Sequence, residues 1–165
     1  MRGIYHELCI NCKDAISDER LLKFGVCEGC LEKIETKSWK QVLQSLKEKG
    51  KLFFAEELLT FHKKFEEFSK FFKKLIGQRM WSLHEVWARR IILKQSFSIV
   101  APTGVGKTVF GAVTALYFAS KGLRSYIIVP TALLVHHTSE RIDLYSERLE
   151  VKPRKICYHA GLSEE

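Results

Sequence analysis

Residues 101–108 read Ala101-Pro102-Thr103-Gly104-Val105-Gly106-Lys107-Thr108 and are the most informative part of the sequence. It matches the phosphate-loop pattern G-x-x-x-x-G-K-[ST], except that Ala101 replaces the first glycine. In such a loop the backbone N–H groups of residues 104–108 hold a phosphate, helped by the positive end of the helix that begins there. The stretch therefore predicts binding of a nucleoside triphosphate, with Lys107 reaching its phosphates and the Thr108 hydroxyl holding Mg²⁺.

The segments on both sides of the loop alternate between strand-like and helix-like patterns. The expected order is strand 97–101, helix 107–120, strand 125–129, helix 131–149 and strand 155–158. Strands that alternate with helices predict a parallel sheet with right-handed crossovers. We therefore expect an α/β fold in which residues 78–165 form the first part of a RecA-like, helicase-type ATP-binding domain.

Upstream of this domain the pattern is helical, which predicts a helical linker or hairpin over residues 37–77. Its first helix places Trp39, Val42 and Leu43 at helical spacing and stops at Gly50. A second run repeats a large apolar residue at alternating spacings of four and three: Phe54, Leu58, Phe61, Phe65, Phe68, Phe72 and Leu75. Such a seam favours packing within the chain, and a helix that binds a partner or lies on DNA is the alternative.

A further helix is expected at residues 82–93. Its apolar face is predicted to be Leu83, Val86 and Trp87. Its outward cations are Arg89, Arg90 and Lys94, which we expect to contact DNA phosphates without base specificity.

Four cysteines near the N-terminus form two pairs, Cys9-x2-Cys12 and Cys27-x2-Cys30. Two residues between thiols let each pair reach one ion, so the spacing predicts a tetrahedral Zn²⁺ site. Four thiolates leave no open coordination position, and the site is therefore structural. Two disulfides or four free thiols are the alternatives, and disulfides are disfavoured in a chain without secretory features. We expect a zinc ribbon over residues 1–36 and a small core residue at the fifth cysteine, Cys157.

Composition narrows the class of protein further. The net charge of +8 favours a polyanionic partner such as nucleic acid. Lys13, Arg20 and Lys23 would let the ribbon contact DNA, and a purely folding role for the ribbon is the alternative. No apolar run reaches the roughly 18 residues of a membrane-spanning helix, so we expect a cytoplasmic protein. Asn11 is the only asparagine, and this scarcity of heat-labile amides fits a thermophile.

Several stretches together resemble one known family. They are Trp87-Ala88-Arg89-Arg90, the run from Ser96 through Thr108 to Gly111, the four-cysteine N-terminus, the Phe-rich segment 65–74 and Pro130-Thr131-x-x-Leu134. In these stretches the chain resembles reverse gyrase, the ATP-dependent type I DNA topoisomerase of hyperthermophiles that introduces positive supercoils. The resemblance covers nearly all 165 residues and is most specific around the phosphate loop.

The resemblance assigns roles to residues of this chain. Zinc ligands are Cys9, Cys12, Cys27 and Cys30. The ATP loop comprises Pro102, Thr103, Gly104, Val105, Gly106, Lys107 and Thr108. Pro130 and Thr131 resemble a helicase motif that touches the DNA backbone. Where the family usually has a glutamine that reads adenine, this chain has His84, which can make one hydrogen bond to the base.

The resemblance also implies parts that this sequence lacks. The acidic residues after the loop are Glu140, Asp143, Glu147, Glu150, Glu164 and Glu165, and none follows a strand-forming run as a Walker B aspartate should. An arginine finger and a topoisomerase tyrosine are also unaccounted for. We expect the N-terminal portion of a reverse gyrase, truncated before Walker B and not catalytically competent alone, with a second chain carrying the remaining domains as a possible partner. A non-enzymatic zinc-ribbon remnant that binds nucleic acid, or another superfamily 2 helicase fragment, is the alternative.

Overall fold

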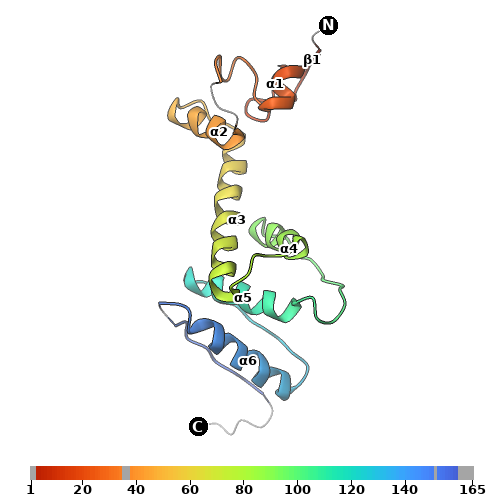
Figure 1. The fold of residues 1–165 in the computed structure, drawn as a ribbon, viewed down its shortest axis with the longest axis vertical. Helices are drawn as coiled ribbons and strands as arrows, with labels where there is room; N and C mark the ends of the chain where they lie inside the picture. The colour runs from red at the N-terminus through yellow and green to blue at the C-terminus, as the bar shows by residue number, and fades with distance from the viewer. Residues whose placement is uncertain (1–2, 35–37, 151, 160–165) are drawn as a thin grey trace. The chain divides into compact units, whose positions relative to one another are not determined.

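The computed structural model describes residues 3–34, 38–150 and 152–159, and most regular structure in them is helical (Figure 1). The elements are β1 (Ile4–Tyr5), β2 (Ile16–Ser17), α1 (Asp18–Lys23), α2 (Trp39–Glu48), α3 (Ala55–Ile76), α4 (Ser82–Ile92), α5 (Lys107–Ser120) and α6 (Ala132–Ser146). The chain forms two compact units, an N-terminal unit, Met1–Lys64, and a C-terminal unit, Phe65–Glu165. The division falls inside α3, so each half of this helix is described with its own unit.

The N-terminal unit has a small core that includes the cysteines. β1 and β2 pair antiparallel, with Ile4 opposite Ser17 and Tyr5 opposite Ile16. Three of the four cysteines are buried together with the apolar residues Ile16, Val26, Leu31, Val42, Leu43, Leu46, Ala55 and Leu59. On the predicted inward face of α2, Val42, Leu43 and Leu46 are buried, but Trp39 is exposed. Gly50 lies just past the end of α2 with a positive φ of 65° that favours glycine.

The apolar seam predicted along α3 is buried in one half only. In the C-terminal unit Phe68, Phe72 and Leu75 are buried, as expected. In the N-terminal unit the prediction is wrong, because Leu58 is exposed and Leu59 is buried in its place. A drift of about 20° per heptad does not explain this difference, because Leu59 lies about 100° around the helix from Leu58. The two halves of α3 belong to different units, and each half contributes its own residues to the core of its unit.

Aromatic rings form the core of the C-terminal unit. Phe68 from α3 meets Tyr117 of α5 edge to face, with ring centroids 5.0 Å apart. Trp87 of α4 meets Phe110 of α5 in the same way at 5.3 Å. Edge-to-face pairs add about 0.5–1.5 kcal/mol each beyond the burial of their area. The rings therefore fix α3, α4 and the start of α5 together.

The buried face of α4 differs from the predicted one. Trp87 is buried as expected, but Leu83 and Val86 are exposed. His84 is buried instead, and its ring stacks on Trp81 and on Phe110. The prediction did not include His84 in the buried face, whereas its flat ring packs among aromatic rings as another aromatic would.

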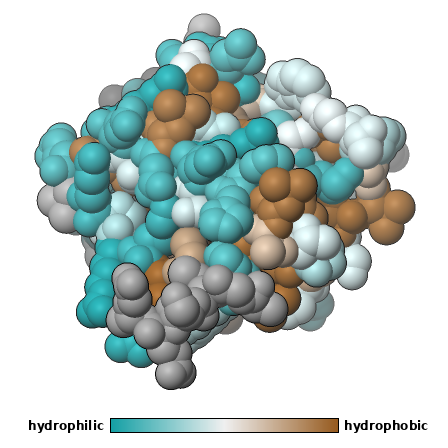
Figure 2. Space-filling view, turned by 90° about the horizontal axis from the view of Figure 1, so that it is seen from below, coloured by the Kyte–Doolittle hydropathy of each residue, from teal (hydrophilic) through white to brown (hydrophobic). Residues whose placement is uncertain are grey.

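The predicted parallel sheet is not formed in the part of the chain that the structure describes. Residues 97–101, 125–129 and 155–158 carry no strand ladder, and the only ladder there is β1 with β2. Val100 is 99% exposed and Ile128 is 94% exposed. An apolar run shows that a segment is suited to burial, but a strand also needs a neighbour to pair with, and the run does not specify one. Hydrophobic groups also reach the surface on the face drawn in Figure 2.

Two helices, α5 and α6, follow the phosphate loop. α5 spans the predicted residues, and Gly122 just beyond it has a φ of 74°. α6 packs beside α5 (Figure 1) and ends at Ser146, three residues short of the predicted Leu149. Among the described residues, no helix combines the length and apolar character needed to cross a membrane.

Candidate metal centre and phosphate loop

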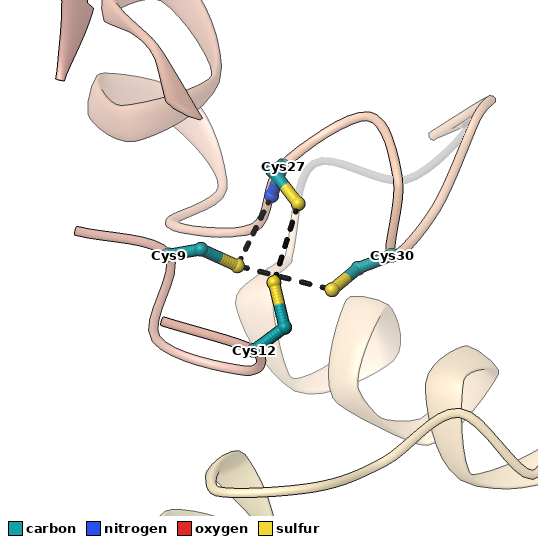
Figure 3. Close-up of side chains that lie close together, drawn as sticks. All are labelled: Cys9, Cys12, Cys27 and Cys30. Carbon is teal, nitrogen blue, oxygen red and sulfur yellow. Dashed lines mark hydrogen bonds between the residues drawn. The ribbon is translucent and has the colours of Figure 1, made fainter. Parts of the chain in front are cut away.

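The four predicted metal ligands come together from two loops of the N-terminal unit (Figure 3). Cys9 and Cys12 lie between β1 and β2, and Cys27 and Cys30 follow α1. All four sulfur atoms lie within 4.8 Å of one another, with Cys9 and Cys30 3.8 Å apart and Cys12 and Cys27 3.5 Å apart.

These separations identify the kind of site. A tetrahedron with metal–sulfur bonds of about 2.3 Å has edges of about 3.8 Å. A disulfide would need sulfur atoms about 2.0 Å apart, and all five cysteines are free thiols. The cysteines are therefore positioned to bind a metal ion.

The electrostatics of the cluster favour a cation. Burial raises the pKa of the Cys12 and Cys30 thiols. Burial acts the same way on Cys9, but backbone N–H groups of Cys12, Cys27 and Asn11 outweigh it and lower the pKa of Cys9 from 9.0 to about 7. One sulfur is thus readily a thiolate, while further thiolates beside it need a positive charge. A divalent ion at their centre supplies that charge.

Asn11, between the first two cysteines, connects the cluster to the turn before α3. It is fully buried, and its amide nitrogen donates to Cys30 Sγ at 3.2 Å and to the Lys51 carbonyl at 2.9 Å. Its amide oxygen accepts a hydrogen bond from the Phe53 N–H at 2.9 Å. Hydrogen bonds of this kind orient metal ligands. The amide therefore holds a ligand sulfur and the 51–53 backbone in one network.

Cations of the ribbon are used inside the N-terminal unit. Arg20 donates to the Leu31 carbonyl at 2.9 Å, and Lys23 pairs with Glu19 at 2.8 Å. Lys13 lies over the Phe54 ring, 5.9 Å from its centroid. Arg20 thus has a role in holding the ribbon together, while Lys23 stays exposed.

The phosphate loop leads directly into α5. Gly104 and Gly106 have φ values of 88° and 85°, which residues with side chains rarely adopt. A side chain at Gly104 would meet nothing within 4 Å, so the loop is open there. Gly106 is the N-cap of α5, whose first N–H groups have no partner within the helix. The backbone thus offers an anion the donors expected of such a loop.

The two polar side chains of the loop differ in their contacts. Lys107 turns back over the loop, where its Nζ donates to the carbonyls of Ala101 and Pro102 at 2.6 and 2.8 Å. Thr108 is exposed in the first turn of α5. The lysine charge is therefore held at the loop by the loop's own backbone.

An open hollow of about 160 Å³ lies beside the loop. Loop residues 104–106 line one part of it, and Phe72, Trp81 and His84 line another. His84 Nε2 lies 2.9 Å from the Val105 carbonyl oxygen. The position singled out for a base contact is thus adjacent to the loop, but its ring nitrogen already contacts the loop backbone.

The candidate DNA contacts lie at the surface of the C-terminal unit. Arg89 pairs with Glu85 at 3.8 Å and lies over the Phe65 ring, and Arg90 lies over the Phe97 ring. Pro130 and Lys94 are exposed. Thr131 is the N-cap of α6, and its hydroxyl accepts from the Leu134 N–H at 3.3 Å. Thr131 therefore has a structural role beside any contact with DNA.

Two contacts were not predicted from the sequence, and one residue, Cys157, is less buried than predicted. The Asn11 network was not foreseen, although a lone asparagine between two cysteines was a usable signal. The contact of His84 with the Val105 carbonyl had no signal, because it joins residues far apart in sequence. Cys157 is half-buried and donates to the Ser139 hydroxyl, outside the four-cysteine cluster.

Comparison with known proteins gives the family. No family model matches the chain. It is 42% identical to a reverse gyrase of Pyrococcus horikoshii, over 98% of this chain and 10% of that protein. It is 41% identical to one of Methanocaldococcus jannaschii, over 97% of this chain and 10% of that protein. For reverse gyrase 1 of Aquifex aeolicus the identity is 46%, over 88% of this chain and 12% of that protein. The chain spans about a tenth of these relatives, and it is homologous to that part of the reverse gyrases.

Proposed function

We propose that this chain is the zinc-stabilised, ATP- and DNA-binding portion of a reverse gyrase. The observation that carries the proposal is the phosphate loop, in which two left-handed glycines, the start of α5 and the Lys107 ammonium converge. Homology to relatives named reverse gyrase supports the same assignment.

Zinc is the metal that suits the cysteine cluster best. Four thiolates in a tetrahedral arrangement favour a soft or borderline ion, and four protein ligands leave no position for a substrate. The metal would hold the loops of Cys9 and Cys27 to each other and would add to the stabilisation that the small apolar core of this unit provides.

The phosphate loop would hold the triphosphate of ATP. The N–H groups from Gly104 to Thr108 would donate to phosphate oxygens, Lys107 would move from its carbonyl partners to the phosphates, and the Thr108 hydroxyl would hold Mg²⁺. The hollow beside the loop offers the Trp81 ring, 59% exposed, as a surface for the base.

Hydrolysis by this chain should stay near background. None of the acidic residues after the loop in these 165 residues follows a strand-forming run, so none has the sequence context of a Walker B aspartate. An arginine finger alone is worth about 10³–10⁵ in rate. We propose that the remaining helicase and topoisomerase parts of such an enzyme supply these groups.

The test uses the full chain with Mg-ATP. Calorimetry should detect weak binding by the wild type and none by Lys107→Ala, while Lys152→Ala, a change at an exposed lysine away from the loop, should bind like the wild type. A phosphate-release assay should show turnover near background. Robust turnover by these 165 residues alone would refute the proposal that they lack catalytic competence.

The alternative is a nucleic-acid-binding module without nucleotide chemistry. It is favoured by the N-terminal unit, which has a metal cluster and core of its own. Binding of DNA together with no detectable binding of Mg-ATP would select this alternative.

A further inference from the structure

His84 is enclosed by aromatic side chains. It is 7% exposed, and its ring stacks on Phe110 with the planes 17° apart and on Trp81 with the planes 13° apart. The rings of Phe72 and Trp87 lie 5.5 and 5.2 Å away. Phe110 belongs to the first turns of α5, the helix that the phosphate loop opens. His84 therefore packs against the element that carries the loop.

The polar contact of the ring fixes its protonation pattern. The Val105 carbonyl can only accept a hydrogen bond, so His84 Nε2, 2.9 Å away, must carry the hydrogen. In the neutral ring, Nδ1 then has a lone pair. Nδ1 is buried and has no hydrogen-bond partner within the described residues. Neither nitrogen is thus open to a ligand while the ring stays in place.

Holding one carbonyl orients a donor of the loop. The peptide between Val105 and Gly106 is trans and planar, so its N–H points opposite to its C=O. With the Val105 oxygen turned to His84, the Gly106 N–H points away from the ring. A Cβ at Gly106 would come within 3.2 Å of His84 Nε2, so the loop lies directly against the ring.

We propose that His84 is a positioning residue for the phosphate loop and takes no part in selecting the base. This inference rests on the proposed nucleotide binding. By turning the Val105 carbonyl toward itself, His84 presents the Gly106 N–H to phosphate. It should therefore contribute equally to every ligand with a triphosphate, whichever base is attached.

The experiment compares three ligands on the full chain: Mg-ATP, Mg-GTP and Mg-tripolyphosphate, which has no base. His84→Phe keeps a flat ring but removes the donor, and affinity for all three should fall by a common factor of about three- to tenfold. His84→Gln restores an N–H donor and should return affinity to within about twofold of the wild type. His137→Phe, the same change at an exposed histidine, should have no effect.

Two outcomes of the binding experiment overturn the proposal. Loss of ATP binding alone, with GTP and tripolyphosphate unchanged, would mean that His84 contacts the base. Unchanged affinity for all three ligands would mean that its hydrogen bond does not matter.

A second measurement does not depend on nucleotide binding. Nitrogen-15 NMR of the wild-type ring should show the hydrogen on Nε2, and amide exchange at Val105 and Gly106 should be faster in His84→Phe than in the wild type or His84→Gln. A hydrogen on Nδ1 overturns the proposal even if His84→Phe fails to fold. If the wild type binds none of the ligands, the proposed function fails, and these two signatures still decide whether His84 holds the loop.

Discussion

Each of the two units has its own core, and the two cores are stabilised by different kinds of side chain. In the N-terminal unit three cysteines and one asparagine are buried within a small apolar core. In the C-terminal unit the centre consists of stacked and edge-on aromatic rings, and the polar loop lies at the surface. A chelator can destabilise a metal-dependent core by removing the metal, whereas an aromatic core is destabilised when its rings are substituted. Each unit should therefore fail under conditions that leave the other intact.

Removal of the metal should produce the largest effect. Structural zinc sites in small domains contribute about 10–16 kcal/mol of binding free energy to folding. Chelation, or Cys27→Ser, should abolish stoichiometric metal and the amide protection of residues 3–34. Protection in α4 and α5 should persist. Hydrogen exchange with metal analysis measures both, and Cys157→Ser is the matched control outside the cluster. Retained protection after complete metal loss would contradict the comparison.

The reverse experiment targets the aromatic core. Phe68 is fully buried and contacts the rings of Phe110 and Tyr117, so Phe68→Ala should cost about 3–5 kcal/mol. Thermal unfolding should show the C-terminal unit melting earlier while one metal per chain remains bound. Phe118→Ala, at a half-buried ring, should cost less. If metal were lost together with Phe68, the two units would not be independent.

A smaller effect is expected from Asn11→Ala. The change leaves the Phe53 N–H and the Lys51 carbonyl without their buried partner, which should cost about 1–3 kcal/mol. It also removes a donor to the Cys30 sulfur, so affinity for the metal should fall about 10–100-fold in chelator competition. Gln44→Ala removes an exposed amide of α2 and should change neither quantity. Unaltered metal affinity would show that the amide is not part of the metal site.

The smallest effect concerns DNA. Each phosphate contact contributes about 0.9 to the slope of log affinity against log salt. If the C-terminal unit binds DNA, Arg89→Ala should lower the magnitude of this slope by about 0.9, the value for one phosphate contact. Fluorescence anisotropy at several salt concentrations measures the slope. Lys23→Ala should leave it unchanged if the ribbon has only a folding role. The opposite result would assign DNA binding to the ribbon.

Local signals in the sequence predicted the site better than the fold. The cysteine spacing predicted the cluster, because a metal site needs only four ligands at short range along two loops. The glycines of the loop and the extent of α5 were also predictable, since backbone conformation at Gly104 and Gly106 is a local property. The sheet was not, because strand pairing joins distant segments that an apolar run does not identify. The burial of His84 could not be predicted for the same reason, since Phe110, on which its ring stacks, lies in a distant segment.

The burial of the Asn11 amide affects how fast this chain can be damaged by deamidation. Asparagine side chains lose ammonia when heated, and Asn11 is the only residue of that type in the sequence. Conversion to aspartate would replace the donor to the Cys30 sulfur with a carboxylate and set two like charges side by side. Because both ends of the amide are tied to protein atoms and closed off from water, that conversion should be slow while the ribbon is folded. Loss of the metal would expose the amide to water. Deamidation should therefore accumulate while the ribbon has no metal bound.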